Sequence, residues 1–417
     1  MHNRKGHILI LVENLPVPFD RRVWMESTTL TAAGYKVSVI SPCPPEERDE
    51  PDRVIDGVHV YRYPMPKETR GKLSFFREFS YCLQQTARLA KRIWKEDRFD
   101  VIQSCNPPDT FWLIARQYKK HGVKFVFDHH DLCPELYESK YRRQDMLWKG
   151  LCWFERQQFR TADAVIATNE SYREVALTRG GKSEDDVVIV RSGPRLDRFT
   201  RVPAEPELKR GRRHLGVYLG VMAVQDGVDY ALRAIRHAID MGLRETAFTF
   251  VGKGDAFEDL QRLAQELNLL QDGTVVFTGR LPDADLCRHL STADFGIAPD
   301  PKDPLNDLCT MNKIVEYMAI GLPIVSFDLK ESRFSAQEAA VYVPDNDERG
   351  MGRAMLELVN DPQKRAFMSS YGRQRVANAL SWEHSRDVLI RFYDRLLGVS
   401  RTRQPTAAEA VLTSDAA

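Results

Sequence analysis

The chain has 417 residues, a length that accommodates two or three domains with cores of their own. Its 60 basic and 59 acidic side chains nearly cancel, which excludes a general electrostatic attraction to nucleic acid and requires any anion site to be local. Seven scattered cysteines without a C-x-x-C pair argue against a zinc site or a disulfide framework and favour reduced thiols in a cytoplasmic compartment.

The first half of the chain alternates strand patterns with helix patterns. Short apolar runs predict strands at 7–12, 36–41, 58–62, 100–104, 124–127, 164–168 and 187–190. Longer periodic segments predict helices at 21–33, 74–95, 110–121 and 146–161. This alternation is typical of parallel βαβ units, so we expect the α/β class.

The turn after the first strand, residues 13–20, contains no glycine. This argues against a dinucleotide-dependent oxidoreductase, whose Gly-rich turn would lie there. Arg21 and Arg22 follow at a helix start and are candidates for binding diphosphate or an anionic acceptor, with a plain charged helix start as the alternative. Asn106 opens a later helix, where it is a candidate for capping N–H groups and, secondarily, for binding an acceptor.

The predicted helix 74–95 combines an aromatic and apolar stripe with basic residues, the pattern of an interfacial helix on an anionic membrane surface. The stripe consists of Phe75, Phe79, Leu83, Ala90 and Trp94. The alternative, which we favour for a helix between two strands, is that this stripe packs on the first sheet. No segment approaches the roughly 20 apolar residues that span a bilayer, so we expect a protein that is soluble or peripheral on the inner face of the membrane.

The densest group of chemically active side chains in the first half is 127–137, FDHHDLCPELY, just past a predicted strand. Loops at strand ends collect functional residues, and His129, His130 and Asp131 are candidates here. A metal site would need further ligands, because neighbouring side chains of an extended chain point to opposite sides. A salt-bridged structural loop is the other interpretation.

A polar segment with several prolines, 195–213, interrupts the alternation and is the predicted linker. Afterwards strands are expected at 215–221, 247–251, 274–278, 295–298, 324–327 and 340–343, with helices at 228–241, 256–267, 284–290, 348–359, 363–380 and 383–397. We therefore predict two doubly wound domains, 1–194 and 214–380, facing a central cleft that is the default ligand site. The tail 400–417 lacks periodicity and is expected to be disordered.

The segment 310–327, TMNKIVEYMAIGLPIVSF, reads as a helix that breaks into a buried strand. Asn312 and Glu316 share a face of this helix, and Lys313 lies about 100° round its axis. A helix N-terminus with a lysine suits phosphate, and a carboxylate one turn later suits a ribose diol. The alternative is an amphipathic helix with a solvated Lys and Glu.

This segment resembles the C-terminal signature of glycosyltransferase family 4, whose members are retaining enzymes with two Rossmann-like domains in the GT-B architecture. The resemblance rests on Lys313, on the residues EYMA from Glu316 and on GLPIV from Gly321. It implies a nucleotide-sugar donor site in the second domain, without metal or other cofactor. The ending Ser381-Trp382-Glu383 is similar to the family's closing segment, which implies that helix 383–398 crosses back onto the first domain.

Within the resemblance, Glu316 binds the donor ribose, and the turn Gly252-Lys253-Gly254 lines the donor site. A structural tight turn is the alternative for this glycine pair. The loop 127–137 is similar to the family's H-D-x-x-P loop, whose histidine contacts the reacting sugar, and we favour His130 over His129 for that contact.

The sequence departs from the family pattern at the phosphate and sugar positions. The loop 220–227 lacks the expected arginine and lysine, with Asp226 in the lysine position, and Leu308 replaces the first glutamate of the signature. Positive charge must then come from Lys313, Lys253 or Arg280. The residues that could replace the missing sugar contact are Asp303, Asn306 and Asp307.

These features predict transfer of a sugar from a nucleotide-sugar to a carbohydrate or polyprenyl-linked acceptor, in the synthesis of a cell-surface polysaccharide or glycolipid. A nucleotide-sugar epimerase of GT-B fold and a catalytically impaired sugar-nucleotide-binding homologue are the alternatives. No nucleic-acid partner is expected.

Overall fold

The computed structural model describes residues 4–44, 52–65, 72–344 and 346–399, and the predicted disorder of 400–417 lies outside this part of the chain. The first half forms an eight-stranded sheet in the order β3-β4-β2-β1-β5-β6-β7-β8. Its strands are β1 (His7–Leu11), β2 (Lys36–Cys43), β3 (Arg53–Ile55), β4 (Val58–Pro64), β5 (Val101–Cys105), β6 (Lys124–His129), β7 (Ala164–Ala167) and β8 (Val187–Ile189). The central pairs β4-β2, β2-β1, β1-β5 and β5-β6 are parallel, as predicted.

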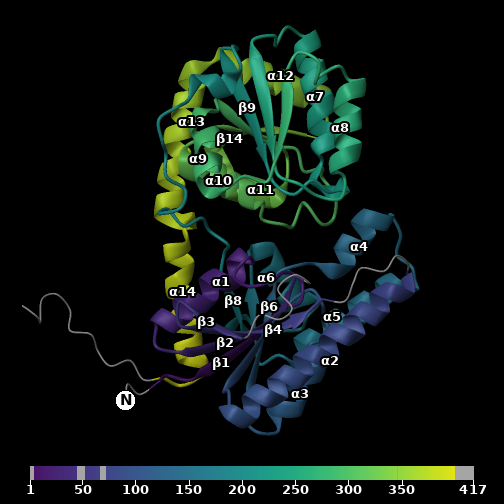
Figure 1. The fold of residues 1–417 in the computed structure, drawn as a ribbon, viewed down its shortest axis with the longest axis vertical. Helices are drawn as coiled ribbons and strands as arrows, with labels where there is room; N and C mark the ends of the chain where they lie inside the picture. The colour runs from purple at the N-terminus through teal and green to yellow at the C-terminus, as the bar shows by residue number, and fades with distance from the viewer. Residues whose placement is uncertain (1–3, 45–51, 66–71, 345, 400–417) are drawn as a thin grey trace, which may run out of the picture. The chain divides into compact units, whose positions relative to one another are not determined.

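Six helices connect these strands (Figure 1). They are α1 (Arg21–Ala32), α2 (Lys72–Glu96), α3 (Trp112–Lys119), α4 (Cys133–Tyr141), α5 (Met146–Thr161) and α6 (Glu170–Thr178). The short elements α4, α6 and β3 were not predicted. For β3 the signal is the turn Asp56-Gly57, in which both residues have positive φ and join β3 to β4 as an antiparallel hairpin.

The second half forms a six-stranded parallel sheet in the order β11-β10-β9-β12-β13-β14. Its strands are β9 (His214–Leu219), β10 (Thr246–Val251), β11 (Val275–Gly279), β12 (Phe295–Ala298), β13 (Ile324–Phe327) and β14 (Ala340–Val343). Its helices are α7 (Val228–Asp240), α8 (Phe257–Glu266), α9 (Asp283–Thr292), α10 (Asn312–Ile320), α11 (Lys330–Ala336), α12 (Glu348–Asn360) and α13 (Pro362–Arg375), and α14 (Trp382–Leu396) follows. The predicted α/β class with two parallel sheets is confirmed.

Apolar side chains cover both faces of the six-stranded sheet. Successive residues of a strand point to opposite faces, so Tyr218 and Val325 join the core under α7, α8 and α12, whereas Val217 and Ile324 join the core under α9 and α10. Burial on both faces explains why these strands read as nearly continuous apolar runs.

The chain divides into two compact units. One contains the chain up to Asp128, Thr161–Val165 and the chain from Arg386 onward, and the other contains His129–Arg160 and Ile166–Ser385. The predicted linker 195–213 lies between the last strand of the first sheet and the first strand of the second. It packs on the second unit, because Arg210 donates hydrogen bonds to the backbone oxygens of Phe248 and Gly273, at 2.9 and 3.1 Å.

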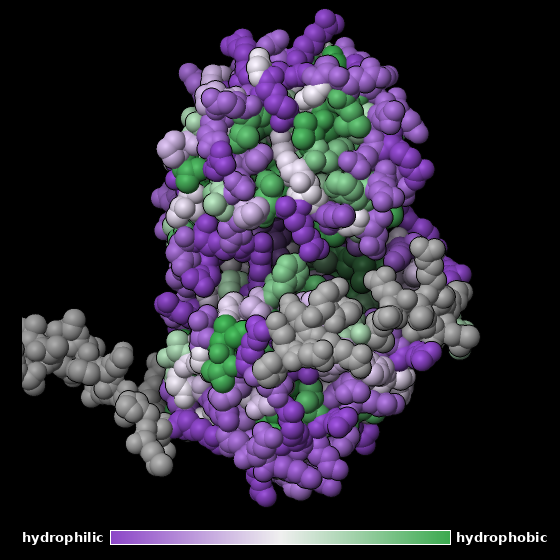
Figure 2. Space-filling view, viewed as in Figure 1, coloured by the Kyte–Doolittle hydropathy of each residue, from purple (hydrophilic) through white to green (hydrophobic). Residues whose placement is uncertain are grey.

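Helix α2 packs inward, which was the favoured alternative for segment 74–95. Cys82, Thr86, Ala90 and Ile93 are buried. The Trp94 ring lies 4.9 Å from that of Phe99 and 5.2 Å from that of Tyr118, between ring centroids, so Trp94 belongs to an aromatic cluster of the core. Among the described residues, no helix is long and apolar enough to cross a membrane. On the face shown in Figure 2, hydrophilic side chains form most of the surface, with apolar patches between them.

Candidate functional site

The loops that follow β9, β10 and β12 meet at the carboxyl edge of the six-stranded sheet. Backbone bonds hold two of them together: the Gly220 N–H donates to Val251 O at 3.1 Å, and the Gly252 N–H donates to Gly279 O at 2.8 Å. This edge is where doubly wound sheets bind ligands. The structure therefore brings the turn at Gly252 and the loop 220–227 together.

Glycine is required for this close approach of backbones. Gly252 has a φ of +136°, and a Cβ there would lie 1.8 Å from Gly220 O. A Cβ on Gly254 would lie 2.5 Å from Met222 O, and one on Gly227 would lie 2.1 Å from Pro299 O. The glycine pair 252 and 254 thus has a packing role, which was the structural alternative for this turn. This packing allows the loops at the candidate site to approach one another closely.

Lys313 lies in a buried cluster at this edge, which we call the Lys313 cluster and which comprises Lys313, Asp300, Asp226 and Tyr218. The Lys313 Nζ atom is 2.5 Å from Asp300 Oδ1 and 5.3 Å from the centre of the Tyr218 ring. Lys313 is 8% exposed and Asp300 is 2% exposed. Lys313 is therefore not a solvated lysine, and its charge is already paired with a carboxylate.

Asp226 adds a second carboxylate within electrostatic reach of Lys313 and Asp300. Its side chain accepts a hydrogen bond from Ala223 N at 2.9 Å. Burial raises the pKa of Asp226 to about 6, Lys313 acts to lower this pKa, and Asp300 acts to raise it. Asp300 and Asp226 share one lysine, so the cluster has an excess of negative charge at neutral pH. A phosphate site would need an excess of positive charge.

We expect Asp226→Asn to stabilise the protein at neutral pH. The pKa of Asp226 rises from 3.8 to about 6 on folding, so the folded state loses stability as pH rises through that window. The asparagine variant lacks this loss and can still accept from Ala223 N. Its melting temperature should equal that of the parent below pH 4 and exceed it above pH 6, by an amount equivalent to at most about 3 kcal/mol.

Asp255→Asn, at an exposed position, is the control and should show no such pH-dependent difference from the parent. Equal melting temperatures of Asp226→Asn and the parent at pH 7.5 would contradict the assignment of a half-buried, ionised Asp226.

The signature helix α10 places Glu316 at a half-buried position. The Glu316 carboxylate lies within electrostatic reach of Arg198. Burial acts to lower the pKa of Arg198, but the hydrogen bond to Asp283 and the charge of Glu316 raise this pKa above its ordinary value. Asn312, Lys253 and Arg280 are exposed. The backbone hydrogen bond that the Gly252 N–H donates to Gly279 O places the exposed Lys253 and Arg280 in adjacent loops.

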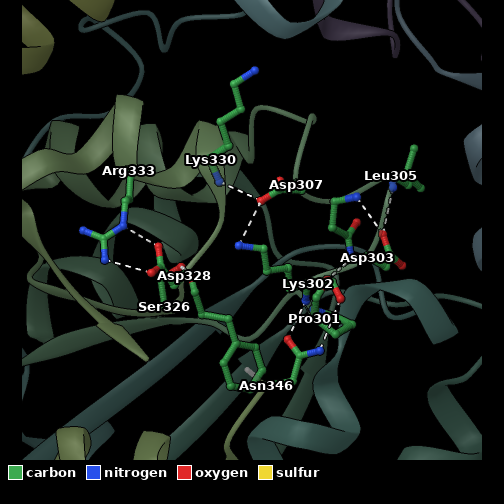
Figure 3. Close-up of polar contacts among 12 residues, drawn as sticks. Pro301, Lys302, Asp303, Leu305, Asp307, Ser326, Asp328, Lys330, Arg333 and Asn346 are labelled. Atoms are coloured by element: carbon green, nitrogen blue, oxygen red, sulfur yellow. Dashed lines mark hydrogen bonds and ion pairs between the residues drawn. The ribbon is translucent and has the colours of Figure 1, made fainter. Parts of the chain in front are cut away.

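The side chains that were predicted to replace the missing sugar contact form hydrogen bonds with the backbone of the loop 299–311 and of neighbouring segments (Figure 3). Asp303 accepts from the backbone N–H groups of Leu305 and Asn306, at 2.9 and 2.7 Å. Asp307 accepts from the backbone N–H of Lys330 at 2.9 Å. Asn306 is buried and donates to Gln225 O at 2.9 Å, which ties this loop to the loop after β9. A sugar contact by any of these residues stays a prediction.

His129 is a core residue, which favours His130 within the pair, and a catalytic role of either histidine stays a prediction. It is fully buried, its ring lies 5.2 Å from that of Phe159 and 5.0 Å from that of Tyr172, and its Nε2 atom is 3.7 Å from Glu155 Oε1. A side chain at the end of β6 that packs among core rings has a structural role in this position. His130 and Asp131, the next residues, are half-buried and remain candidates.

Arg22 belongs to a buried network of ion pairs, and its role as a phosphate or acceptor ligand stays a prediction. Its Nη2 atom is 2.9 Å from Asp128 Oδ1 and 3.1 Å from Glu26 Oε1. Burial acts to lower the pKa of Arg22, but both carboxylates raise it above its ordinary value. Arg21 is exposed, whereas Asn106 is only 2% exposed.

Sequence reasoning missed Asp300, the partner of Lys313, and Glu155, which pairs with Arg179 at 2.7 Å. Asp300 had a usable signal, because it lies two residues after a predicted buried strand, where functional side chains gather. Glu155 had none, because an acid on an amphipathic helix is usually exposed.

Comparison with known proteins gives matches over most of the chain. Residues 20–193 match a model described as glycosyl transferase 4-like domain, and residues 213–361 match one described as glycosyl transferases group 1. A phosphatidyl-myo-inositol mannosyltransferase of Mycolicibacterium smegmatis is 28% identical over 95% of this chain and 97% of its own length. A glycogen synthase of Mycobacterium tuberculosis is 23% identical over 87% of each chain.

The fold is also that of a solved structure. A sucrose-phosphate synthase from Thermosynechococcus elongatus superposes with a TM-score of 0.76 at 17% identity, covering 95% of this chain and all of its own.

Proposed function

We propose that this chain, which belongs to glycosyltransferase family 4 and has the GT-B fold, transfers a sugar from a nucleoside diphosphate sugar to a carbohydrate or lipid-linked acceptor. Transfer proceeds with retention and without a metal or cofactor. The observation that carries the proposal is the half-buried Glu316, one turn into a helix that begins at the carboxyl edge of a doubly wound sheet. The product belongs to a cell-surface polysaccharide or glycolipid.

We assign the donor as follows. Glu316 accepts hydrogen bonds from the ribose hydroxyls. The first N–H groups of α10, beside Asn312, bind the diphosphate together with the exposed Lys253 and Arg280. Lys313 contributes less positive charge than the motif implies, because Asp300 already neutralises it.

Glu316→Gln tests the donor site. A hydrogen bond to a charged group contributes about 1.5–3 kcal/mol, so the variant should bind the cognate nucleoside diphosphate roughly 10 to 100 times more weakly. Calorimetric titration with a panel of nucleoside diphosphates measures this, and Glu258→Gln, an exposed glutamate of α8, is the matched control. Unchanged affinity at an unchanged melting temperature would remove Glu316 from the site.

His130→Ala tests the assignment of this histidine to the reacting sugar. Turnover at saturating donor should fall by at least about tenfold, the contribution of a group acting in the transition state, whereas nucleoside diphosphate affinity should stay the same. His129→Ala is the contrast: it opens a cavity in the core, so it should lower the melting temperature. A loss of diphosphate affinity equal to the loss of turnover in His130→Ala would contradict a role specific to the sugar.

One observation favours a second candidate, a sugar-nucleotide-binding homologue without transfer activity. The Lys313 cluster carries excess negative charge where the departing diphosphate must be stabilised, and Leu308 offers no polar group to the sugar. Release of nucleoside diphosphate distinguishes the candidates, because a transferase releases it when an acceptor is present. An epimerase would instead interconvert the donor sugars, and a binding protein would do neither.

We also propose that the enzyme works in the cytoplasm and associates peripherally with an anionic membrane surface, where a polyprenyl-linked acceptor would lie. Trp94 packs inward, so this residue of the α2 stripe is not available for the contact.

A further inference from the structure

Helix α5 exposes large apolar side chains on its outward face. Met146 is 78% exposed, Trp153 is 50% exposed and Leu147 is 43% exposed. At about 100° per residue, one outward stripe runs along the helix and consists of Met146, Gly150, Trp153 and Gln157. Tyr141, at the end of the preceding helix α4, is also 50% exposed. Large apolar side chains gathered on one exposed face mark an interaction surface.

The opposite face of α5 holds its buried polar groups. Glu155, Gln158 and Phe159 are buried. Glu155 is the only acidic residue of the helix, and it is paired with Arg179, whose Nε atom is 2.7 Å from Glu155 Oε2. The outward face of α5 therefore carries no negative charge.

Basic residues flank the outward stripe on one side. Lys149, Arg156 and Arg160 are exposed and lie about 40–80° round the helix from Met146. None of the three forms an ion pair with another described residue, whereas Arg143 in the preceding turn is paired with Asp145 at 3.0 Å. The uncompensated positive charge of this flank would attract an anionic surface.

We propose that this α5 face, made of Met146, Leu147, Trp153, Lys149, Arg156 and Arg160, docks on the surface of an anionic lipid bilayer. The apolar residues enter the boundary between headgroups and acyl chains, and the long basic side chains reach the lipid phosphates. A second copy of the chain is a poorer occupant, because a twofold interface would place these cations against each other. This inference deepens the membrane association proposed above but does not depend on sugar transfer.

Co-sedimentation of the full chain with vesicles tests the proposal. Vesicles of phosphatidylglycerol and phosphatidylcholine should bind the protein at low salt and bind it less at high salt, and pure phosphatidylcholine should not bind it. Trp153→Ser should weaken binding about tenfold. Reversing all three charges, in Lys149→Glu with Arg156→Glu and Arg160→Glu, should weaken it about a hundredfold or more.

Matched controls lie on other helices. Phe367→Ser replaces an aromatic residue of α13 that is 56% exposed, and Arg262→Glu reverses a charge on α8, so both should bind vesicles as the parent does. Retained binding by the α5 variants, or binding lost only with Arg88→Glu and Lys91→Glu on α2, would overturn the proposal. So would a parent that is dimeric in light scattering and becomes monomeric in Trp153→Ser.

Nucleoside diphosphate affinity separates this inference from the proposed function. The α5 variants should keep the parent's affinity and melting temperature, since α5 lies outside the donor site. If no nucleoside diphosphate binds while vesicle binding follows the expected pattern, the transferase proposal fails and the membrane surface stands.

Discussion

Arg22→Met is expected to lower the free energy of unfolding by about 3–5 kcal/mol, the cost of removing one partner from a buried ion pair. Asp128 and Glu26 are both fully buried and both contact the Arg22 guanidinium. Without it, two carboxylates would face each other away from water, and one of them would have to bind a proton.

Arg21→Met is the matched control, because the neighbouring arginine is exposed and its loss should change stability by no more than about 0.5 kcal/mol. Thermal melting is the measurement, with an expected fall on the order of 10 °C for Arg22→Met. The deficit should be smaller at pH 4.5 than at pH 7.5, since protons can neutralise the stranded carboxylates. Equal melting temperatures for the two variants would show that the network contributes no stability.

Lys313→Met should produce the largest change at the candidate site. Asp300 is 2% exposed and Asp226 already has a raised pKa, so removing the lysine leaves both carboxylates without their cation. We expect a loss of about 3–5 kcal/mol at pH 7.5 that diminishes as pH falls below about 6 and the carboxylates bind protons.

The double variant Lys313→Met with Asp300→Asn distinguishes the stability that comes from the charge of Lys313 from the stability that comes from the packing of its side chain. Stability should be largely restored, because replacing both partners leaves no uncompensated buried charge. Lys302→Met, whose side chain is 50% exposed, serves as the surface control. The aliphatic stem of Lys313 lies near Tyr218 and Gly220. A double variant no more stable than Lys313→Met alone would show that this stem contributes more to stability than the charge of the lysine does.

The order of elements could be predicted from the sequence because hydrophobic periodicity is a local signal. The predicted strands 295–298, 324–327 and 340–343 have the bounds of β12, β13 and β14. The helix predicted at 146–161 has the bounds of α5. The segments that escaped prediction, such as α4 and α6, bury few large apolar side chains, so their hydrophobic period is weak.

The family signature also predicted how helix α10 ends. Helix α10 follows a strand of the second sheet and ends at Gly321, which adopts the left-handed conformation (φ +82°) that the Gly-Leu-Pro break predicted. Spacing along one helix is enough to place Asn312 and Glu316 on a shared face, because 3.6 residues make a turn in any α-helix.

What the sequence alone determined was therefore the α/β class, the two parallel sheets and the family to which the motifs belong. The tertiary structure decided which charged side chains are available to a ligand. Arg22 meets Asp128 from 106 positions away, and Lys313 is paired with Asp300. Burial depends on which segments pack together, and a charge that leaves water must find a partner, so these roles follow from the fold as a whole and not from local pattern.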